Sequence, residues 1–161
     1  RGDRMDYAIQ KATELGVHTI IPIACERSVV RLNSEQALRR LEHWQAVAVA
    51  AAEQSHRHSV PSVLAIESFE HYVQRESLAP RILLNPMASE PLSAISLPNT
   101  SDGHQSVALM IGPEGGFSSN EEQLALRLGV KDYRLGPRVL RTETAAAAAI
   151  TALQLLHGDL K

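Results

Sequence analysis

Segments patterned as helices alternate with short apolar runs along the whole chain. In the helix-patterned segments, apolar residues recur three or four positions apart, as they do on one face of an α-helix. The predicted helices cover residues 4–15, 34–55, 69–75 and 119–128, and a last helix begins after Thr142 or Thr144 and runs to His157. The apolar runs are shorter, and they predict strands over residues 19–23, 62–66, 81–84, 107–111 and 132–135. This alternation is typical of an α/β fold with a mostly parallel sheet and helices on both faces.

Polar residues and proline mark the ends of these elements. The expected N-caps are Asn33 or Ser34, Ser118 or Ser119, and Thr142 or Thr144. Glu121 and Glu122 each follow one of the two serines by three positions, which is the pattern of a capping box. Pro22 lacks a main-chain N–H, so it is expected at a bulge or an edge of its strand. The polar stretch 99–105 is predicted to be a loop.

Composition narrows the class of protein but does not indicate a partner. The 161 residues suggest one domain, and no apolar run approaches the roughly 20 residues of a membrane span. No secretion leader is visible, and Cys25 is the only cysteine, so we expect a cytoplasmic protein. The formal net charge is −2, so any claim of nucleic-acid binding must depend on local motifs.

Three predicted strand ends carry the candidate chemistry. The loops are Leu84–Pro86, Gly112–Phe117 and Leu135–Thr144, and they combine glycine and proline with apolar residues. In a parallel sheet, ligands gather outside the carboxyl ends of the strands. Such loops offer main-chain hydrogen bonds beside apolar surface, which suits an adenine ring. A lone Gly-Pro is more often a simple turn, but turns alone do not explain the paired glycines or the crowded arginines. Nucleotide motifs of the G-x-G-x-x-G and P-loop types are absent from the sequence.

Two of these loops also match known signatures. Residues 111–117 read IGPEGGF and residues 135–144 read LGPRVLRTET. They resemble the signature loops of the RsmE family, SPOUT-class methyltransferases that methylate N3 of a uridine in small-subunit ribosomal RNA. Further matches follow in order at residues 10–17, 26–28, 44, 52–55, 57 and 61. The resemblance covers nearly the whole chain, and the longer motif is specific.

The resemblance implies a fold and an assembly as well as an activity. It implies one SPOUT-like domain over residues 1–161 with a C-terminal trefoil knot, an exception to the rule against threaded chains. It implies a homodimer that packs through the C-terminal helix. Family members carry an N-terminal β-barrel that binds RNA, and a first strand of the knotted domain, before the position of Arg1. Both are expected to be missing from this chain.

The resemblance also implies S-adenosylmethionine as the cofactor, held without a metal. The implied contacts, largely through main chain, are Leu84, Gly112, Gly115, Leu135, Gly136 and Leu140. Neighbouring candidates on the same loops are Asn85, Pro86, Glu114, Arg138 and Thr142. The histidines show no spacing that suits a metal, and His56 and His58 lack carboxylate or cysteine partners in register.

Three residues are candidates for catalysis. Arg141 is the first choice to contact the uracil oxygens, because a guanidinium stays protonated and suits an enolate-like oxygen. Its structural alternative is an ion pair with Glu114 or Glu143. Either glutamate is a candidate to accept the N3 proton, and either could instead orient an arginine or a backbone amide. Solvent is the remaining candidate acceptor.

Contacts to RNA are expected at Arg57, Gln54 and Arg27, with Arg31 as a possible addition to a phosphate patch. A solvated helix end explains Arg57 equally well, and Arg57 is also a candidate contact to a partner subunit. Two other functions stay open at this point. One is a knotted cofactor-binding or RNA-binding module without catalysis, and the other is methylation of a different RNA nucleotide.

Overall fold

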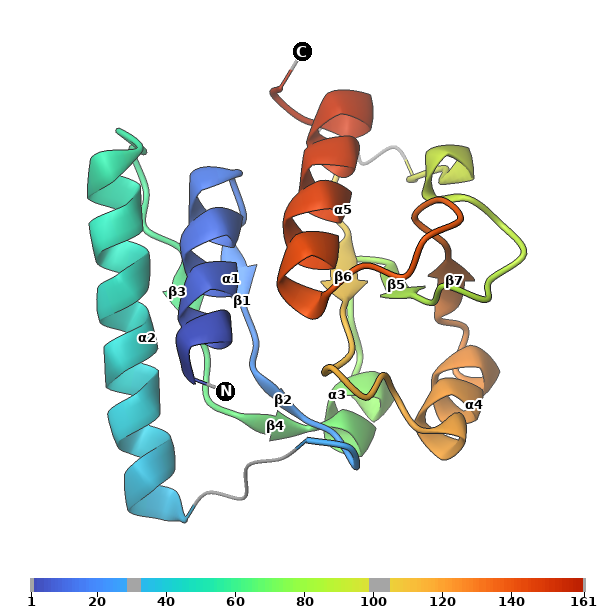
Figure 1. Ribbon diagram of the computed structural model, residues 1–161, viewed down its shortest axis with the longest axis horizontal. Coiled ribbons are helices and arrows are strands. Elements are labelled where there is room, and N and C mark those ends of the chain that lie inside the picture. The colour runs from blue at the N-terminus through green and yellow to red at the C-terminus, as the bar shows by residue number, and fades with distance from the viewer. Residues whose placement is uncertain (1, 29–32, 99–104, 161) are drawn as a thin grey trace.

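Every pairing between the strands that the structure describes is parallel, as the alternation of elements predicts (Figure 1). The computed structural model describes residues 2–28, 33–98 and 105–160. The helices are α1 (Gly2–Glu14), α2 (Ser34–Gln54), α3 (Phe69–Gln74), α4 (Ser119–Arg127) and α5 (Thr142–His157), with a 3-10 turn η1 (Leu92–Ala94). The strands are β1 (Thr19–Ile20), β2 (Ile23–Ala24), β3 (Ser62–Val63), β4 (Glu67–Ser68), β5 (Arg81–Leu84), β6 (Ala108–Met110) and β7 (Lys131–Tyr133). The predicted loop at 99–105 lies almost wholly outside the described residues.

The sheet of β5, β6 and β7 is covered by helices on both faces. Its strand order is β6-β5-β7, so β5 is the central strand. Ile82 faces a core cluster that includes Ala149 and Leu153 of α5. The next residue, Leu83, faces the opposite cluster with residues of α3 and α4, including Phe69 and Ala125. Because side chains alternate along a strand, one apolar run supplies both cores, which is why β5 reads as continuously apolar.

The N-terminal strands are shorter than the sequence predicts. The predicted strand at 19–23 is divided into β1 and β2, and the one at 62–66 is replaced by β3 and β4. Pro22 lies in the first interruption, as expected for a residue without an N–H, and its carbonyl accepts from the N–H of Glu67 at 3.1 Å. The result is two small parallel pairs, β1 with β3 and β2 with β4, in place of one longer sheet.

Helix α1 lies between α2 and α5 and contacts both (Figure 1). The last carbonyls of a helix have no partner within it, so they need donors from elsewhere. Arg57 donates from Nη1 to the carbonyls of Thr13 and Val17 at 2.9 and 2.7 Å. Gln154 of α5 donates from Nε2 to the carbonyl of Leu15 at 2.9 Å. The C-terminal end of α1 is therefore tied to both neighbouring helices.

Two of the expected N-caps are confirmed with full capping boxes. Asn33 accepts from the N–H of Gln36, whose side chain accepts from the N–H of Asn33. Ser118 and Glu121 make the same reciprocal pair at the start of α4. Within the described part of the chain, no helix has both the length and the apolarity needed to cross a membrane.

The end of α2 holds a strained residue. His56 has φ of 55°, in the left-handed region that side chains with a Cβ disfavour. Its N–H bonds to the carbonyl of Glu53, and the N–H of Arg57 bonds to the carbonyl of Ala52. These two bonds form a Schellman motif, in which glycine is the usual residue at the position of His56.

We predict that His56→Gly stabilises the protein by about 0.5–1 kcal/mol, because relief of the left-handed strain outweighs the added freedom of the unfolded chain. Thermal unfolding should show a rise in Tm of about 1–4 °C. The mirror-image control is Gly129→Ala, at φ of 84° with no atom within 4 Å of the added methyl group. It should lower stability by about 1 kcal/mol. A lower Tm for His56→Gly would contradict the strain argument.

Candidate active site

Three loops meet at one edge of the sheet because β6, β5 and β7 run in the same direction. We call them loop 1 (Leu84–Pro86), loop 2 (Gly112–Phe117) and loop 3 (Leu135–Arg141). Loop 1 follows β5 and is joined to β7 by the N–H of Asn85, which donates to the carbonyl of Tyr133 at 3.0 Å. Loop 3 is joined to loop 2 by the hydroxyl of Thr142, which donates to the carbonyl of Gly112 at 3.2 Å.

Loop 2 is a tight turn that leaves no room for a side chain at its start. The N–H of Gly116 bonds to the carbonyl of Pro113 at 2.8 Å, and Gly116 has φ of 70°. A Cβ at Gly112 would lie 3.1 Å from the backbone nitrogen of Phe117 and 3.2 Å from its ring. Phe117 is buried and packs on Phe69, with ring centroids 5.2 Å apart. A methyl group at 112 would therefore push the backbone or the ring of Phe117 away by a few tenths of an ångström.

Residues from the N-terminal half hold loop 2 in place. Arg4 of α1 forms an ion pair with Glu114. Arg27 donates from Nη1 to the carbonyl of Gly115 at 2.8 Å. Glu121 is buried, and its two carboxylate oxygens accept from the N–H groups of Glu26 and Ser118 at 2.8 and 2.7 Å. Loop 2, the segment after β2 and the start of α4 thus form one hydrogen-bonded unit.

The middle of loop 3 has a main chain that is not paired with the part of the chain that the structure describes. No described residue forms a hydrogen bond with the backbone between Gly136 and Leu140. Gly136 has φ of 73°, and no atom lies within 4 Å of the place where a Cβ would be. Gly136, Arg138 and Val139 are exposed, while Leu135 and Leu140 are half-buried. A run of unused N–H and C=O groups beside half-buried leucines suits a ligand such as adenine.

The comparisons with known proteins bear on this site. A sequence model described as the RNA methyltransferase domain matches residues 1–154. The chain belongs to the RNA methyltransferase domain family. It is 38% identical over 99% of its length to ribosomal RNA small subunit methyltransferase E of Bacillus subtilis (strain 168), of which it covers 65%. The resemblance to the RsmE family is confirmed.

Two solved structures of similar proteins hold the same ligand. The first is ribosomal RNA small subunit methyltransferase E from Neisseria gonorrhoeae bound to S-adenosyl methionine, with a TM-score of 0.90, 40% identity, and 100% of this chain and 65% of that chain covered. The second is a methyltransferase from Legionella pneumophila in complex with the bound cofactor SAM, with a TM-score of 0.92, 36% identity, and 99% and 64% covered. The chain spans less than two thirds of the length of each of these relatives.

Loop 3 runs directly into α5, but the residue at the N-cap position of this helix is not one of those predicted. Thr142 and Thr144 were the expected caps, and both are wrong: α5 begins at Thr142, and Arg141 occupies the N-cap position without a side-chain hydrogen bond. The physical reason is that the hydroxyl of Thr142 is used between loops, on the carbonyl of Gly112. The start of α5 therefore has no side-chain cap, and the hydroxyl of Thr142 connects loop 3 to loop 2 instead.

The three candidate catalytic residues have different surroundings. Arg141 is exposed and makes no ion pair with a described residue, so the alternative that it pairs with Glu114 or Glu143 is not observed. Glu114 pairs with Arg4 instead. Glu143 is half-buried, and its Oε2 is buried with no hydrogen-bond partner among the described residues.

The candidate cofactor residues of loop 1 already make contacts within the protein. Asn85 is half-buried, and its side chain donates to Asp132 at 3.1 Å and accepts from the N–H of Met87 at 2.9 Å. Leu84 is half-buried and packs against the core that faces α5, whereas Pro86 is exposed. Loop 1 therefore offers apolar surface and main chain, with its polar side chain already in use.

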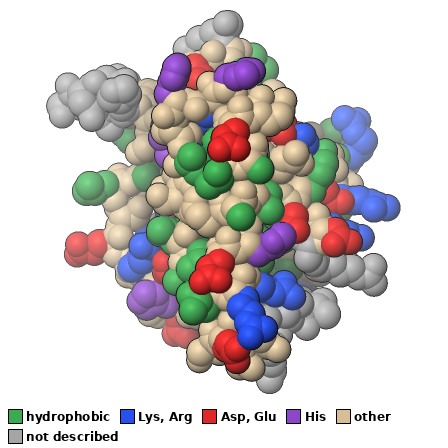
Figure 2. All heavy atoms as spheres, turned by 90° about the vertical axis from the view of Figure 1, so that its left-hand side faces the viewer, with side chains coloured by type: hydrophobic (Ala, Val, Ile, Leu, Met, Phe, Trp, Pro, Cys, Tyr) green, Lys and Arg blue, Asp and Glu red, His purple; other side chains and the backbone are tan. Residues whose placement is uncertain are grey.

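The candidate RNA contacts do not form one patch with these loops. Arg27 lies against loop 2, but Arg57 is engaged with the end of α1, and the exposed Gln54 is the last residue of α2. Arg31 lies outside the described residues. The face that α2 presents carries charges of both signs among apolar side chains (Figure 2), and Arg39 on it pairs with Glu35 at 2.6 Å. This face is not a continuous basic surface.

Sequence reasoning missed two residues that build the site. The sequence pattern places Arg4 in a helix and Glu121 in a capping box. In the structure each also bonds to a partner distant in sequence. A pattern of local spacing cannot reveal such pairs. For Glu121 the available signal was its position in the first turn of α4, directly after loop 2.

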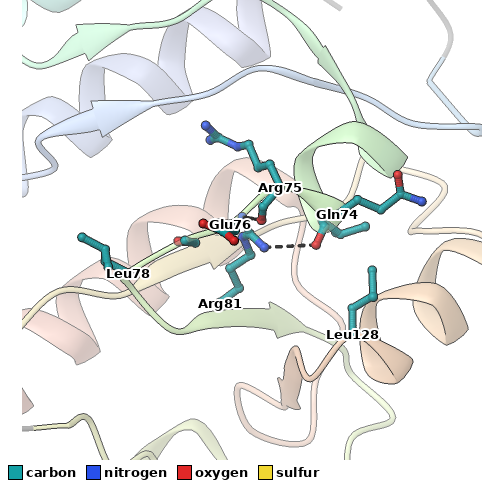
Figure 3. A pocket seen from close by; sticks show the side chains of 8 residues that line it. Gln74, Arg75, Glu76, Leu78, Arg81 and Leu128 are labelled. Carbon is teal, nitrogen blue, oxygen red and sulfur yellow. Dashed lines mark hydrogen bonds between the residues drawn. The ribbon is translucent and has the colours of Figure 1, made fainter.

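Two other features can be set apart from the site. A hollow of about 540 Å³ lies beside α3, where Arg81 donates to the carbonyls of Val73 and Arg75 (Figure 3). Arg81 begins β5, so this hollow is at the opposite end of the strand from loop 1.

Burial, and secondly the charge of Glu121, raises the pKa of the Cys25 thiol to about 12, so it stays protonated at neutral pH and is no nucleophile.

We predict that Gly112→Ala destabilises the ligand-free protein by about 1–3 kcal/mol, because the added methyl group crowds the backbone and ring of Phe117 in loop 2. Denaturant unfolding of the purified chain measures this change. Gly115→Ala is the matched control, since its methyl group would meet only Arg27 carbons at 3.4 Å or more, and it should shift stability by no more than about 0.5 kcal/mol. Equal losses in the two variants would show that crowding at Gly112 is not the cause.

Proposed function

We propose that this protein is an S-adenosylmethionine-dependent RNA methyltransferase that methylates N3 of a uridine in small-subunit ribosomal RNA. The observation that carries the proposal is the main chain of loop 3, which makes no hydrogen bond with described residues between Gly136 and Leu140. It lies beside loops 1 and 2, at the carboxyl edge of a parallel sheet. The similar proteins of known structure that hold S-adenosylmethionine support it. The relatives named for small-subunit ribosomal RNA support the substrate.

The three loops would hold the cofactor mainly through main chain and apolar contacts. The proposed contacts are Leu84, Asn85, Pro86, Gly112, Glu114, Gly115, Leu135, Gly136, Arg138, Leu140 and Thr142. Half-buried leucines suit the faces of an adenine, and free N–H and C=O groups suit its edge. The proposal includes no metal; among the described residues there is no group of three or more potential metal ligands.

Bound S-adenosylmethionine supplies the methyl group, and the protein must handle the charge that develops on the target base. Uridine N3 carries a proton near neutral pH, and its loss places negative charge on the uracil oxygens. Arg141 is exposed, makes no ion pair with a described residue and is next to Leu140, so it is the proposed stabiliser of that charge. Glu114 is occupied by Arg4, which makes it the weaker candidate acceptor; the proton passes to solvent directly or by way of Glu143.

The proposal includes a wider assembly. A trefoil knot would place loop 3 and α5 through the chain, in keeping with the bond from Thr142 to Gly112. A homodimer would bury the apolar side of α5, where Leu155 and Leu156 are exposed. We expect a cytoplasmic setting, because ribosomal RNA is the proposed substrate.

Contacts to RNA are proposed at Arg27, Arg57 and Gln54. Arg27 and Arg57 each use one guanidinium nitrogen on main-chain carbonyls, so each keeps further N–H donors for a phosphate. Their contribution to affinity would be electrostatic and would fall as salt rises.

We predict that the chain binds S-adenosylmethionine in the presence of a chelator. Isothermal calorimetry of this chain without RNA tests the pocket by itself, with thermal shift as a second readout. Binding and a rise in Tm are expected, since a ligand that binds the native state stabilises it. Absence of both heat and thermal shift at millimolar ligand would refute the proposed function.

We predict that Arg141→Ala lowers single-turnover methylation in the full-length protein by about a hundredfold or more, the usual effect of removing one donor to a developing oxyanion. Cofactor affinity and Tm should change little, because the side chain is exposed and makes no ion pair with described residues. Measuring all three on one variant separates catalysis from structure. Normal turnover in folded Arg141→Ala would remove this residue from the mechanism.

A further inference from the structure

Glu121 is a buried residue whose two carboxylate oxygens bond to different parts of the chain. It lies in the first turn of α4 and is 5% exposed. Its Oε2 accepts from the N–H of Ser118 at 2.7 Å, within the capping box of its own helix. Its Oε1 accepts at 2.8 Å from the N–H of Glu26, which is 95 residues away in sequence. The capping box needs only the first of these bonds, so the second has a different role.

The bond to Glu26 anchors a turn that carries Arg27. The N–H of Ser28 donates to the carbonyl of Cys25 at 3.0 Å, and the hydroxyl of Ser28 accepts from the N–H of Cys25 at 3.0 Å. Glu26 and Arg27 are the two central residues of this turn. Anchoring the N–H of Glu26 therefore also places Arg27, whose side chain is exposed and depends on the turn for its position.

Arg27 in turn holds one peptide unit of loop 2. Its Nη1 donates to the carbonyl of Gly115 at 2.8 Å. The N–H of the same peptide unit, on Gly116, donates to the carbonyl of Pro113 at 2.8 Å. Both polar groups of this unit are thus in use, whereas the N–H groups of Glu114 and Gly115 make no hydrogen bond with a described residue. Holding the one unit fixes the direction in which the neighbouring N–H groups point.

We propose that Glu121 is a positioning residue for cofactor binding and that it acts through Arg27 on loop 2. This inference rests on the proposed function, in which loop 2 contacts S-adenosylmethionine, and deepens it. While Glu26 is anchored, loop 2 is held in one arrangement before the ligand arrives, so binding does not bear the cost of ordering it. Without the anchor, Arg27 lies on a looser turn, and water competes with it for the carbonyl of Gly115.

A double-mutant cycle on cofactor affinity tests the inference. S-adenosylhomocysteine is titrated by calorimetry into the 161-residue chain and into Glu121→Ala, Arg27→Ala and the double variant, at a temperature at which each is folded. Each single change should weaken binding about three- to tenfold, because the ligand must then order loop 2. If Glu121 acts through Arg27, the losses do not add, and the double variant should lie within about twofold of the weaker single variant.

Two further variants separate positioning from stability. Ser118→Ala removes the N-cap side chain of α4 but keeps the main-chain N–H that bonds to Glu121, so it should lower Tm by about 2–4 °C and leave affinity unchanged. Arg27→Lys keeps a cationic donor on the same turn, so it should retain more affinity than Arg27→Ala does. If Glu121→Ala does not fold, Glu26→Pro replaces it in the cycle, because proline removes the same bond from the donor side.

Several outcomes would overturn the inference. Losses that add in the double variant would mean that Glu121 and Arg27 act independently. A loss in Ser118→Ala as large as that in Glu121→Ala would mean that any damage to the start of α4 weakens binding. Unchanged affinity in either single variant of the cycle would refute the connection through loop 2. An unaltered chain that binds no S-adenosylhomocysteine would instead refute the proposed function itself.

Discussion

The parallel pairing of β5 with both β6 and β7 is the constraint on which the site depends. Because the three strands run in one direction, loops that are far apart in sequence emerge at the same edge. The apolar residues of β5 supply a core on each face of the sheet, so the strand cannot shift its register by one residue without exposing both cores. Burial thus fixes the register, and the register fixes where the loops lie. The position of the candidate site therefore depends on core residues of β5 that are not themselves part of the site.

Helix α1 connects the N-terminal half of the chain to the candidate site. Its C-terminal carbonyls are held by Arg57 and Gln154, and from its first turns Arg4 reaches Glu114 in loop 2. One helix therefore links α2, α5 and the site. This arrangement explains why Arg57, which sequence reasoning reads as an RNA contact or a solvated helix end, is partly withdrawn from solvent. Carbonyls at a helix end lack a partner within the helix, so here they accept hydrogen bonds from the Arg57 guanidinium.

The sequence predicts the elements and the loops well, and their connections poorly. Strand β5, the capping box at Ser118 and the C-terminal end of α5 follow from periodicity and from local hydrogen bonding, which neighbouring residues determine. The division of the predicted strand at 19–23 was only partly foreseen, because Pro22 gives the place of the interruption but not the pairing with β4. The cap of α5 was predicted wrongly because a tertiary bond, from Thr142 to Gly112, outweighed the local preference. Long-range pairs such as Arg4 with Glu114 leave no trace in local spacing.

The use of arginine in and around the site bears on an apparent conflict between the net charge and the proposed function. A chain with a formal charge of −2 does not attract RNA as a whole. Arg4 and Arg27 are also withdrawn in part, because each is bonded to loop 2. Arg138 and Arg141, in contrast, are exposed on loop 3 and make no ion pair with a described residue. Among the described residues at this site, the arginines without an ion pair therefore lie on the same loop whose main chain makes no hydrogen bond with described residues. Binding of the cofactor and contact with the target base would then depend on one short segment, held on one side by Thr142 and on the other by β7.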